Sequence, residues 1–313
     1  MVIPSFRRPT RLAFALEALA AQTLPADSFE VLVVGDPSDP DLAREWPAAN
    51  VRVLEVAATG PARRRNVGWR AGAADLVAFT DDDCRPSPDW LSELLAAGGE
   101  LETILQGPTL PDPSELHLLY GIARSIRIEG PDRWYPSCNI AYPRALLERL
   151  GGFDESLSFF GEDTDLGLRA EAIGARLRFV DGALVHHAVH VRRLGDALRD
   201  ATERHAEAAV LARHPEHRSE LEFGAFISRE HALLTLAWLG LGLGLLRSDF
   251  RLTAAGTLPY LGYKLARKRA AGARIDPAGI ARLAIDIAAE TVVDAVEITM
   301  RARSSLKHGQ LVL

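Results

Sequence analysis

The stretch 76–90, "LVAFTDDDCRPSPDW", places three adjacent carboxylates directly after a short apolar run. Asp81, Asp82 and Asp83 repel one another, and holding them together in a folded site costs free energy unless a cation lies among them. Two prolines follow and prevent the run from continuing as a regular strand. The stretch therefore predicts a buried strand that ends at a cation site.

Short β-type runs alternate with helical stretches from residue 1 to about residue 190. The apolar residues of the helical stretches 11–21 and 62–71 recur at spacings of three and four. This alternation predicts an α/β fold, with a mostly parallel sheet flanked by helices. The predicted strands are residues 2–3, 29–34, 51–56, 76–80 and 177–180.

Strand-type runs stop after about residue 190, where Ala- and Leu-rich helical sequence takes over. We therefore divide the chain into a domain of residues 1–190 and a helical C-terminal region of residues 191–313. No repeat or low-complexity linker separates the two parts.

Composition excludes several classes of protein. With 313 residues, 48% of them hydrophobic and 25% charged, the chain can bury a large core and is not a disordered protein. A net charge of −6 argues against general affinity for nucleic acid. Cys84 and Cys138 are the only cysteines, which fits a reducing cytoplasm. No segment of the signal-peptide type precedes the first strand, so we expect a cytoplasmic protein.

Charged residues also follow the other predicted strands, where ligands of such sheets bind. Asp36 and Asp39 follow the second strand, and Arg63, Arg64 and Arg65 open the helix in "GPARRRNVG". Guanidinium groups near a helix start suit a diphosphate. A divalent metal, Mg²⁺ or Mn²⁺, held by carboxylates beside a diphosphate therefore explains the acidic triplet.

Six motifs in order resemble family 2 glycosyltransferases over roughly residues 1–190. The motifs are "VIPSFRR", "FEVLVVGDPSD", "GPARRRNVGWRAG", "LVAFTDDDCRPSPDWL", "SCNIAYPRALLERLGGFDE" and "GEDTDLGLRAEAIG". The resemblance implies a GT-A fold, a Rossmann-like, mostly parallel sheet, and inverting transfer of a sugar from a nucleotide-diphosphate sugar. A single D-x-D is a weak signal, since solvated acidic loops are common, but six motifs in order are specific.

The resemblance implies metal ligands at Asp81 and Asp83, which match the family's D-x-D, and at His187 in "LVHHAVH". Asp82 is the variable middle residue of that motif. Gly35 stands where the family usually has an acid before Asp36, which weakens the expectation for base recognition. The expected donor-binding residues are Pro4, Ser5, Asp36, Arg65, Asn66, Asp81, Asp82 and Asn139.

The pair Glu162 and Asp163 matches the family's E-D motif at a helix start, which implies that Asp163 is the general base. Adjacent residues do not share one helix face, so Glu162 is expected to support the base or the helix terminus. The alternative is a simple helix cap. Asp165 and Arg169 lie one turn apart and predict an ion pair.

Three further residue types near the site have open interpretations. His186 is a weaker metal candidate than His187, because a histidine is more often structural. Trp134 can stack on a sugar or fill the core. Cys138 is expected to be a small buried residue, since the metal prefers oxygen ligands.

The C-terminal region contains two apolar runs, residues 232–246 and 252–263. Each is shorter than the roughly 20 residues that span a bilayer, so we predict a helical hairpin in the membrane interface. A following basic cluster is expected on anionic lipid headgroups. The alternative is a buried helical pair packed on the catalytic domain or in a dimer. The cluster consists of Lys264, Arg267, Lys268, Arg269 and Arg274.

These observations predict a metal-dependent inverting glycosyltransferase that acts at the cytoplasmic face of a membrane. Its expected acceptor is a hydroxyl of a lipid-linked or polysaccharide molecule, as in polysaccharide biosynthesis of the cell envelope. A catalytically silent sugar-nucleotide or polysaccharide-binding scaffold is an alternative, because of Gly35. A nucleotidyltransferase is a weaker one, because "PSFRRPTR" after the first strand is not Gly-rich.

Overall fold

The computed structural model describes residues 1–39, 50–57, 60–157, 160–203, 206–270 and 277–313. The chain forms two compact units. The first, here called the sheet unit, consists of Met1–Leu118 and Ser125–His190. The second, the helical unit, consists of Leu119–Arg124 and Val191–Leu313.

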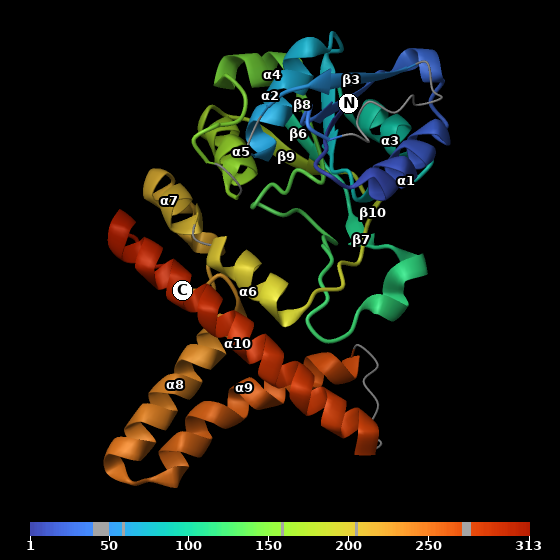
Figure 1. Ribbon diagram of the computed structural model, residues 1–313. Helices are drawn as coiled ribbons and strands as arrows, with labels where there is room; N and C mark the ends of the chain where they lie inside the picture. The colour runs from blue at the N-terminus through green and yellow to red at the C-terminus, as the bar shows by residue number, and fades with distance from the viewer. Residues whose placement is uncertain (40–49, 58–59, 158–159, 204–205, 271–276) are drawn as a thin grey trace. The chain divides into compact units, whose positions relative to one another are not determined.

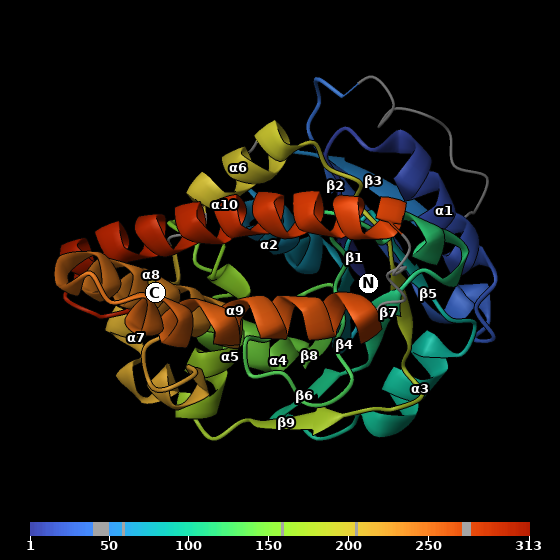
Figure 2. The same cartoon turned by 90° about the horizontal axis from the view of Figure 1, so that it is seen from below.

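The sheet unit is built on a seven-stranded sheet. Its strands are β1 (Val2–Pro4), β2 (Val31–Gly35), β3 (Val51–Glu55), β4 (Leu76–Thr80), β6 (Thr103–Gln106), β8 (Asn139–Pro143) and β9 (Arg176–Phe179). They lie in the order β3-β2-β1-β4-β8-β6-β9, which Figure 2 shows from below. Only β8 pairs antiparallel, with β4 and with β6, among the named strands of this sheet. The predicted fold class, a mostly parallel sheet flanked by helices, is confirmed.

The described part of the sheet unit contains the helices α1 to α5 (Figure 1). They are α1 (Pro9–Ala20), α2 (Pro61–Ala71), α3 (Trp90–Ala97), α4 (Arg144–Leu150) and α5 (Glu162–Ala172). Both α1 and α2 carry proline at the first helical position, where its fixed φ suits a helix and its missing N–H is not needed. The helix α1 buries Leu12, Leu16 and Leu19, at spacings of four and three, against the sheet core.

The register of the central strands brings the candidate site residues to one edge. Ile3 of β1 pairs with Val33 of β2, and both are fully buried. Since β1 is parallel to both β2 and β4, the carboxyl ends of these three strands lie at the same edge of the sheet. The chain leaves that edge at Ser5, Asp36 and Asp81, respectively.

A second, three-stranded sheet completes this edge. It consists of β5 (Cys84–Pro86), β7 (Thr109–Pro111) and β10 (Val185–His187), in the order β5-β10-β7. The antiparallel pair of β10 and β5 sets His187 opposite Cys84, the residue after Asp83. None of these three strands was predicted from the sequence; each has only three residues and shows no periodic pattern.

The helical unit consists of α6 (Leu194–Glu203), α7 (Ala206–Arg213), α8 (Arg229–Arg247), α9 (Phe250–Ala270) and α10 (Pro277–His308). Only Ser248 and Asp249 separate α8 from α9, and the two helices lie side by side as a hairpin (Figure 1). The hydroxyl of Ser228 caps α8 by accepting a hydrogen bond from the backbone N–H of His231.

Buried ion pairs fill the base of this hairpin. Lys264 Nζ lies 2.8 Å from Asp294 Oδ2 and 3.1 Å from Glu290 Oε2, and its side chain is almost fully buried. Burial alone would lower the pKa of Lys264, but the charges of Asp294 and Glu290 raise it. Two further pairs are Arg267 with Glu230 and Lys268 with Glu290.

The predicted role of the basic cluster on lipid headgroups is wrong for Lys264, because its ammonium is enclosed by acids of α8 and α10. Lys268 is also engaged within the protein, since its ammonium donates a hydrogen bond to the carbonyl oxygen of Gly121. Arg274 lies outside the described residues.

Among the residues that the structure describes, no helix is long and apolar enough to cross a bilayer.

Candidate active site at the strand ends

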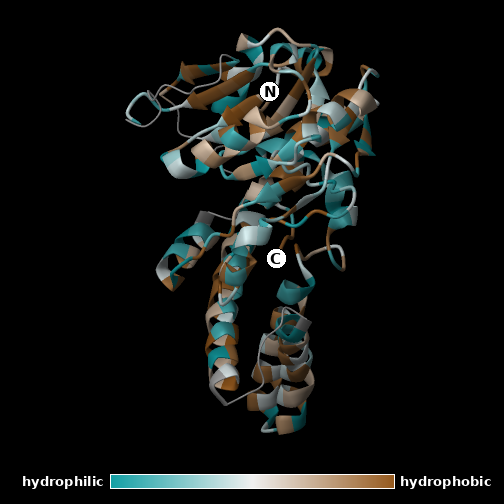
Figure 3. Ribbon diagram, turned by 90° about the vertical axis from the view of Figure 1, so that its right-hand side faces the viewer, coloured by the Kyte–Doolittle hydropathy of each residue, from teal (hydrophilic) through white to brown (hydrophobic). Residues whose placement is uncertain are grey.

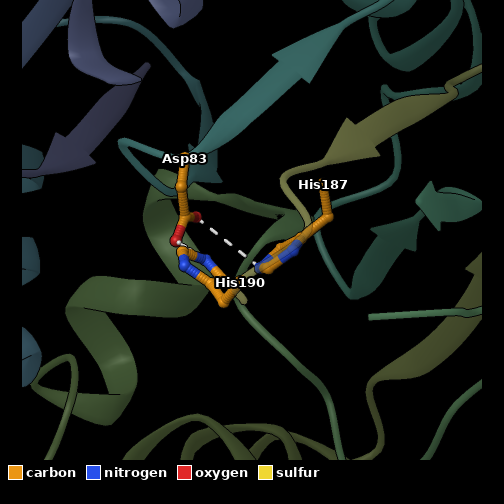
Figure 4. Close-up of side chains that lie close together, drawn as sticks. All are labelled: Asp83, His187 and His190. Atoms are coloured by element: carbon orange, nitrogen blue, oxygen red, sulfur yellow. Dashed lines mark hydrogen bonds and ion pairs between the residues drawn. The ribbon is translucent and has the colours of Figure 1, made fainter. Parts of the chain in front are cut away.

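A cluster of one carboxylate and two imidazoles lies where β4 ends. Asp83 points toward His187 and His190, as Figure 4 shows. The Nε2 atom of His190 is 2.9 Å from Asp83 Oδ2, and that of His187 is 3.6 Å from Asp83 Oδ1. One ligand atom from each of the three residues can be chosen so that all lie within 4.8 Å of one another. The cluster is thus compact enough to hold one metal ion.

The hydrogen bonds of His187 fix its tautomer in a form suited to a metal. Its Nδ1 atom is 2.8 Å from the carbonyl oxygen of Ala188. A carbonyl only accepts, so Nδ1 carries a proton, and deprotonation of the ring frees the Nε2 lone pair on the side of Asp83 for a metal. A donor set of one carboxylate and two imidazoles fits a divalent transition ion such as Mn²⁺, and fits Mg²⁺ less well.

Asp81 does not belong to this cluster. Its Oδ1 atom accepts a hydrogen bond of 2.9 Å from Arg65, and its side chain is partly exposed. The structure thus joins two of the three predicted metal ligands, Asp83 and His187, and adds His190. The spacing of His187 and His190 after a strand was the signal available for the third member.

Asp82 ties the loop after β1 to the end of β4. Its side chain is buried and accepts hydrogen bonds from Ser5 Oγ at 3.2 Å, from the backbone N–H of Phe6 at 3.0 Å and from Arg8 at 3.2 Å. Burial and the charge of Asp83 raise the pKa of Asp82 to about 6. The predicted donor residues Pro4 and Ser5 lie in and directly after β1, so this tie holds them at the site edge.

Arg8 supplies the positive charge that the acidic triplet requires, and the sequence interpretation missed it. Its NH1 atom lies 2.5 Å from Asp83 Oδ2. Burial alone would raise the pKa of Asp83, but the hydrogen bond from His190 and the charges of His187 and Arg8 hold it well below its ordinary value. Asp83 is therefore ionised at neutral pH.

Arg65 connects this edge to the start of α5. The guanidinium is buried and donates to Glu162 Oε1 at 2.7 Å and to Asp81 Oδ1 at 2.9 Å. Burial would lower the pKa of Arg65, but Asp81 and Glu162 raise it. Of its neighbours, Arg63 is exposed and Arg64 lies over the ring of Phe6.

Asp163 lies in the first turn of α5. Gly161 caps that helix with φ of 88°, a left-handed conformation that favours glycine, and contributes no side chain. The carboxylate of Asp163 accepts from the backbone N–H of Ser137 at 3.3 Å and remains partly exposed. Burial and the charge of Glu162 raise the pKa of Asp163 to about 7. A carboxylate with this pKa suits a general base at neutral pH.

Two neighbours support α5. Glu162 is buried and paired with Arg65, so it supports the helix terminus and does not face solvent. Arg169 Nε lies 2.7 Å from Asp165 Oδ2, which confirms the predicted ion pair one turn apart.

The two asparagines expected at the donor are buried in the frame of the unit. Both amide hydrogens of Asn139 are donated, to the carbonyl oxygens of Pro108 and Ala183, each at 2.8 Å. Asn66 donates to the carbonyl oxygen of Phe153 at 2.8 Å and to Glu155 at 2.9 Å. In this arrangement both side chains join loops to the sheet, and neither has an exposed polar atom for a donor.

Asp36 is partly exposed after β2, as a nucleotide contact requires. It accepts hydrogen bonds from the backbone N–H of Ser38 at 2.8 Å and from its hydroxyl at 2.6 Å, and these bonds lower the pKa of Asp36. Asp39 lies deeper and accepts from the backbone N–H of Arg7 at 2.8 Å. Cys138 is buried, as expected, and burial raises the pKa of its thiol.

Comparison of the sequence with known proteins gives one family. The sequence model of glycosyl transferase family 2 matches residues 1–143. "Glycosyltransferase AglE" of Haloferax volcanii is 32% identical over 215 residues, which cover 64% of this chain and 69% of that protein. "Pre-mycofactocin glycosyltransferase" of Mycobacterium tuberculosis is 32% identical over 203 residues, 60% of this chain. The chain spans only 42% of the length of that relative.

Solved structures share the fold. A mannosyltransferase from Pyrobaculum calidifontis, in complex with GDP-Man and Mn²⁺, superposes with a TM-score of 0.58 at 19% identity and covers 98% of this chain. S. aureus TarS in complex with UDP-GlcNAc gives a TM-score of 0.52 at 18% identity. The structures show the shared fold, and the sequence matches establish that the chain belongs to glycosyl transferase family 2.

Proposed function

We propose that this protein transfers a sugar, with inversion, from a nucleotide-diphosphate sugar to an acceptor hydroxyl, and that the reaction depends on a divalent metal. The observation that carries the proposal is the pairing of two different acidic centres at one sheet edge. The cluster of Asp83, His187 and His190 offers ligands for a cation, and Asp163 offers a carboxylate of pKa about 7. Two ion pairs, Asp81 with Arg65 and Arg65 with Glu162, link the end of β4 to the start of α5, where Asp163 lies.

The proposed step needs no covalent sugar intermediate. Asp163 accepts the proton of the acceptor hydroxyl, and the hydroxyl oxygen forms a bond to the anomeric carbon. The bond from that carbon to the diphosphate oxygen breaks on the opposite face, and the electron pair leaves with the nucleoside diphosphate. A metal held by Asp83, His187 and His190 would neutralise the charge that develops on this leaving group.

The arginines of the site have separate roles in this proposal. Arg65 holds the Glu162 side chain in place beside Asp163, and the charge of Glu162 helps to raise the pKa of Asp163 to about 7. Arg8 is half exposed beside Asp83, where it can contact a diphosphate. We assign donor contacts to Pro4, Ser5, Asp36, Arg65 and Asp81, and a positioning role to Asp82, Asn66 and Asn139.

The family and the edge of the sheet at which these residues meet support the proposed donor class. Two structures of the same fold are in complex with GDP-Man and with UDP-GlcNAc, respectively. We propose a nucleotide-diphosphate sugar of this general kind for the present chain. We further propose a lipid-linked or polysaccharide acceptor at the inner face of the cell membrane, in the synthesis of an envelope polysaccharide.

A panel of nucleotide sugars tests the proposal. Purified protein is incubated with each donor and with Mn²⁺, Mg²⁺ or EDTA, with and without a membrane lipid extract, and release of nucleoside diphosphate is measured. We expect release from one donor that requires metal and that increases with lipid. Asp83→Ala should abolish both metal-dependent nucleotide binding and release, whereas the exposed Asp89→Ala, six residues further along the chain, should leave both unchanged.

Two results would contradict the proposal. Release at full rate in EDTA would exclude the metal. Tight, metal-dependent nucleotide binding with no release from any donor or acceptor would favour the catalytically silent scaffold, for which Gly35 in place of an acid before Asp36 is the supporting observation.

A further inference from the structure

The hairpin of α8 and α9 has an apolar outer surface. Residues 232–246 and 252–263 contain no charged side chain. In Figure 3, brown and pale colours therefore dominate the two helices between their charged ends. Leu246 is 84% exposed and Phe250 is 78% exposed. The other large exposed side chains of the hairpin are Leu236, Trp238, Leu239, Leu241, Leu243, Leu245, Leu258, Leu261 and Leu265.

Small residues form the contact between the two helices. A Cβ placed on Gly240 would lie 2.7 Å from the Cα of Gly256, so the two backbones touch there. A Cβ on Gly244 would collide with Thr253. At this level of the hairpin the helices meet through glycines, and the large apolar side chains named above are exposed.

This distribution is the reverse of what water favours. In a hairpin that folds in water, large apolar side chains pack between the helices and polar ones face outward. Helices in lipid gain nothing from hiding leucine from the solvent, and they associate through small residues that let the backbones approach. The hairpin therefore has the packing pattern of helices that are surrounded by lipid.

Helix α10 covers only the base of the hairpin. The apolar cluster that joins the three helices consists of Leu234, Ala237, Tyr260 and Ile298. Beyond this cluster, the buried residues of α8 are Gly240 and Gly244, both on the side that faces α9. Among the described residues of the helical unit, none of the buried apolar cluster extends to the outer half of the hairpin.

The exposed side chains of α8 form two stripes, because residues three and four apart share one face of a helix. An interface with a second copy of the chain needs only one face, whereas lipid contacts an inserted hairpin on more than one side. The first stripe is Leu236, Leu239, Leu243 and Leu246, and the second is Trp238, Leu241 and Leu245.

We propose that the outer half of this hairpin inserts into one leaflet of a membrane, at the boundary between headgroups and acyl chains. The uncharged part of α8, 15 residues at about 1.5 Å each, is about 22 Å long and shorter than the hydrocarbon core of about 30 Å. The hairpin therefore lies in the interface and does not cross it.

The charges at the tip select anionic lipid. Arg247 and Arg251 are exposed at the turn, and among the described residues neither forms an ion pair. Long basic side chains next to an apolar stretch reach toward lipid phosphates. Asp249 offsets one of the two charges, so we expect a moderate preference for anionic lipid.

This inference concerns where the proposed transferase works and rests on the proposed function only for the acceptor. Because the two units are one chain, insertion of the hairpin keeps the sheet unit at a membrane surface, where lipid-linked acceptors are concentrated. Membrane binding can be measured without any donor, so its failure and the failure of glycosyl transfer are distinguishable.

Flotation with vesicles of phosphatidylcholine and phosphatidylglycerol tests the inference. The full chain should float with these vesicles and less with pure phosphatidylcholine. The double variant Leu243→Glu, Leu246→Glu should reduce partitioning at least about 10-fold, because two charges enter the apolar layer. The matched control is Leu306→Glu on α10, where the leucine is 89% exposed but lies outside the hairpin. It should partition like the parent.

Trp238 reports the depth of insertion. We expect brominated lipids to quench the part of the tryptophan fluorescence that is lost in Trp238→Phe. Absence of flotation of the parent chain, or equal partitioning of the glutamate variant and its control, would overturn the inference. A stable dimer in sedimentation equilibrium that Leu243→Glu dissociates, without vesicle binding, would assign this surface to a second copy instead.

Discussion

Both units of this protein gather charged side chains, most of them buried or partly buried, but the balance of charge differs between the units. At the strand ends of the sheet unit, two arginines, Arg8 and Arg65, face five carboxylates: Asp81, Asp82, Asp83, Glu162 and Asp163. In the helical unit, four cations, Lys264, Arg267, Lys268 and Arg301, face the five carboxylates Glu207, Glu230, Glu290, Asp294 and Glu297.

The difference separates a site from a structural core. In the nearly balanced cluster of the helical unit, the cations and carboxylates pair with one another, and these pairs fix how α8, α9 and α10 meet. A cluster that is short of positive charge holds one carboxylate, Asp163, with a pKa raised to about 7 and leaves Asp83 beside two imidazoles that can bind a cation. Buried charge alone does not indicate function, whereas an uncompensated excess of one sign does.

If the excess of negative charge in the sheet unit marks the active site, the largest expected effect is the loss of kcat in Asp163→Asn. The amide keeps the shape of the side chain but cannot accept a proton, so kcat should fall by about 10²- to 10⁴-fold. The measurement is release of nucleoside diphosphate under saturating donor and acceptor. Binding of the nucleotide, measured by calorimetry, should change less than about twofold, because the carboxylate acts on the acceptor.

Asp163→Asn should also leave the thermal unfolding midpoint near that of the parent, since the carboxylate is partly exposed and its burial is unfavourable. Full turnover in this variant would remove Asp163 from the mechanism. The family assignment would be unaffected by that result.

Lys264→Met should have the opposite effects: it should lower the free energy of unfolding and leave kcat nearly unchanged. It removes the central cation of the helical unit and leaves Asp294 and Glu290 buried without their main partner. Loss of one member of a buried ion pair costs about 3–5 kcal/mol of the free energy of unfolding. Chemical denaturation followed by circular dichroism measures this loss, and kcat at low temperature should stay near that of the parent.

The matched control is Arg269→Met, an exposed cation of the same helix that should change the free energy of unfolding by less than about 0.5 kcal/mol. If Lys264→Met were as stable as this control, the buried cluster would not hold the helices. If it abolished turnover while remaining folded, the helical cluster would be part of the active site and the comparison above would be wrong.

The smallest effect is the dependence of the reaction on pH. Asp163 acts as a base only when it is ionised, and its pKa is about 7, so kcat/KM should rise with pH by about tenfold from pH 6 to pH 8. Glu162→Gln removes the charge that raises this pKa and should shift the midpoint of the profile to lower pH. A midpoint that stays in place would show that Glu162 does not act on the base.

Much of the fold could be predicted because its central strands are continuous apolar runs. The predicted strands 2–3, 51–56 and 76–80 agree within one residue with β1, β3 and β4. Strand β8, with the sequence "NIAYP", was not predicted. Its antiparallel pairing with β4 depends on contacts between residues that are far apart in the sequence. The sequence also predicted the wrong partner for Lys264, a lipid headgroup in place of a buried acid. Its acidic partner Asp294 lies on another helix, 30 residues further along the chain.

The candidate site was predicted in composition more accurately than in geometry. The motifs indicated Asp83, His187 and Asp163, because acids and histidines after strands are visible in the sequence. They did not indicate Arg8, whose partner is 75 residues away, or the inward position of Asn139. A side chain's residue type shows what it can bind, whereas burial determines whether it is free to do so.

The segment Leu119–Arg124 belongs to the helical unit although its neighbours in sequence belong to the sheet unit. There Gly121 accepts from Lys268, and the carbonyl oxygen of Ile122 accepts from Arg192. The chain therefore crosses between the units three times, and a truncation after residue 190 would leave these six residues without their partners. Exchanging the helical unit for that of another protein therefore requires the transfer of this loop as well.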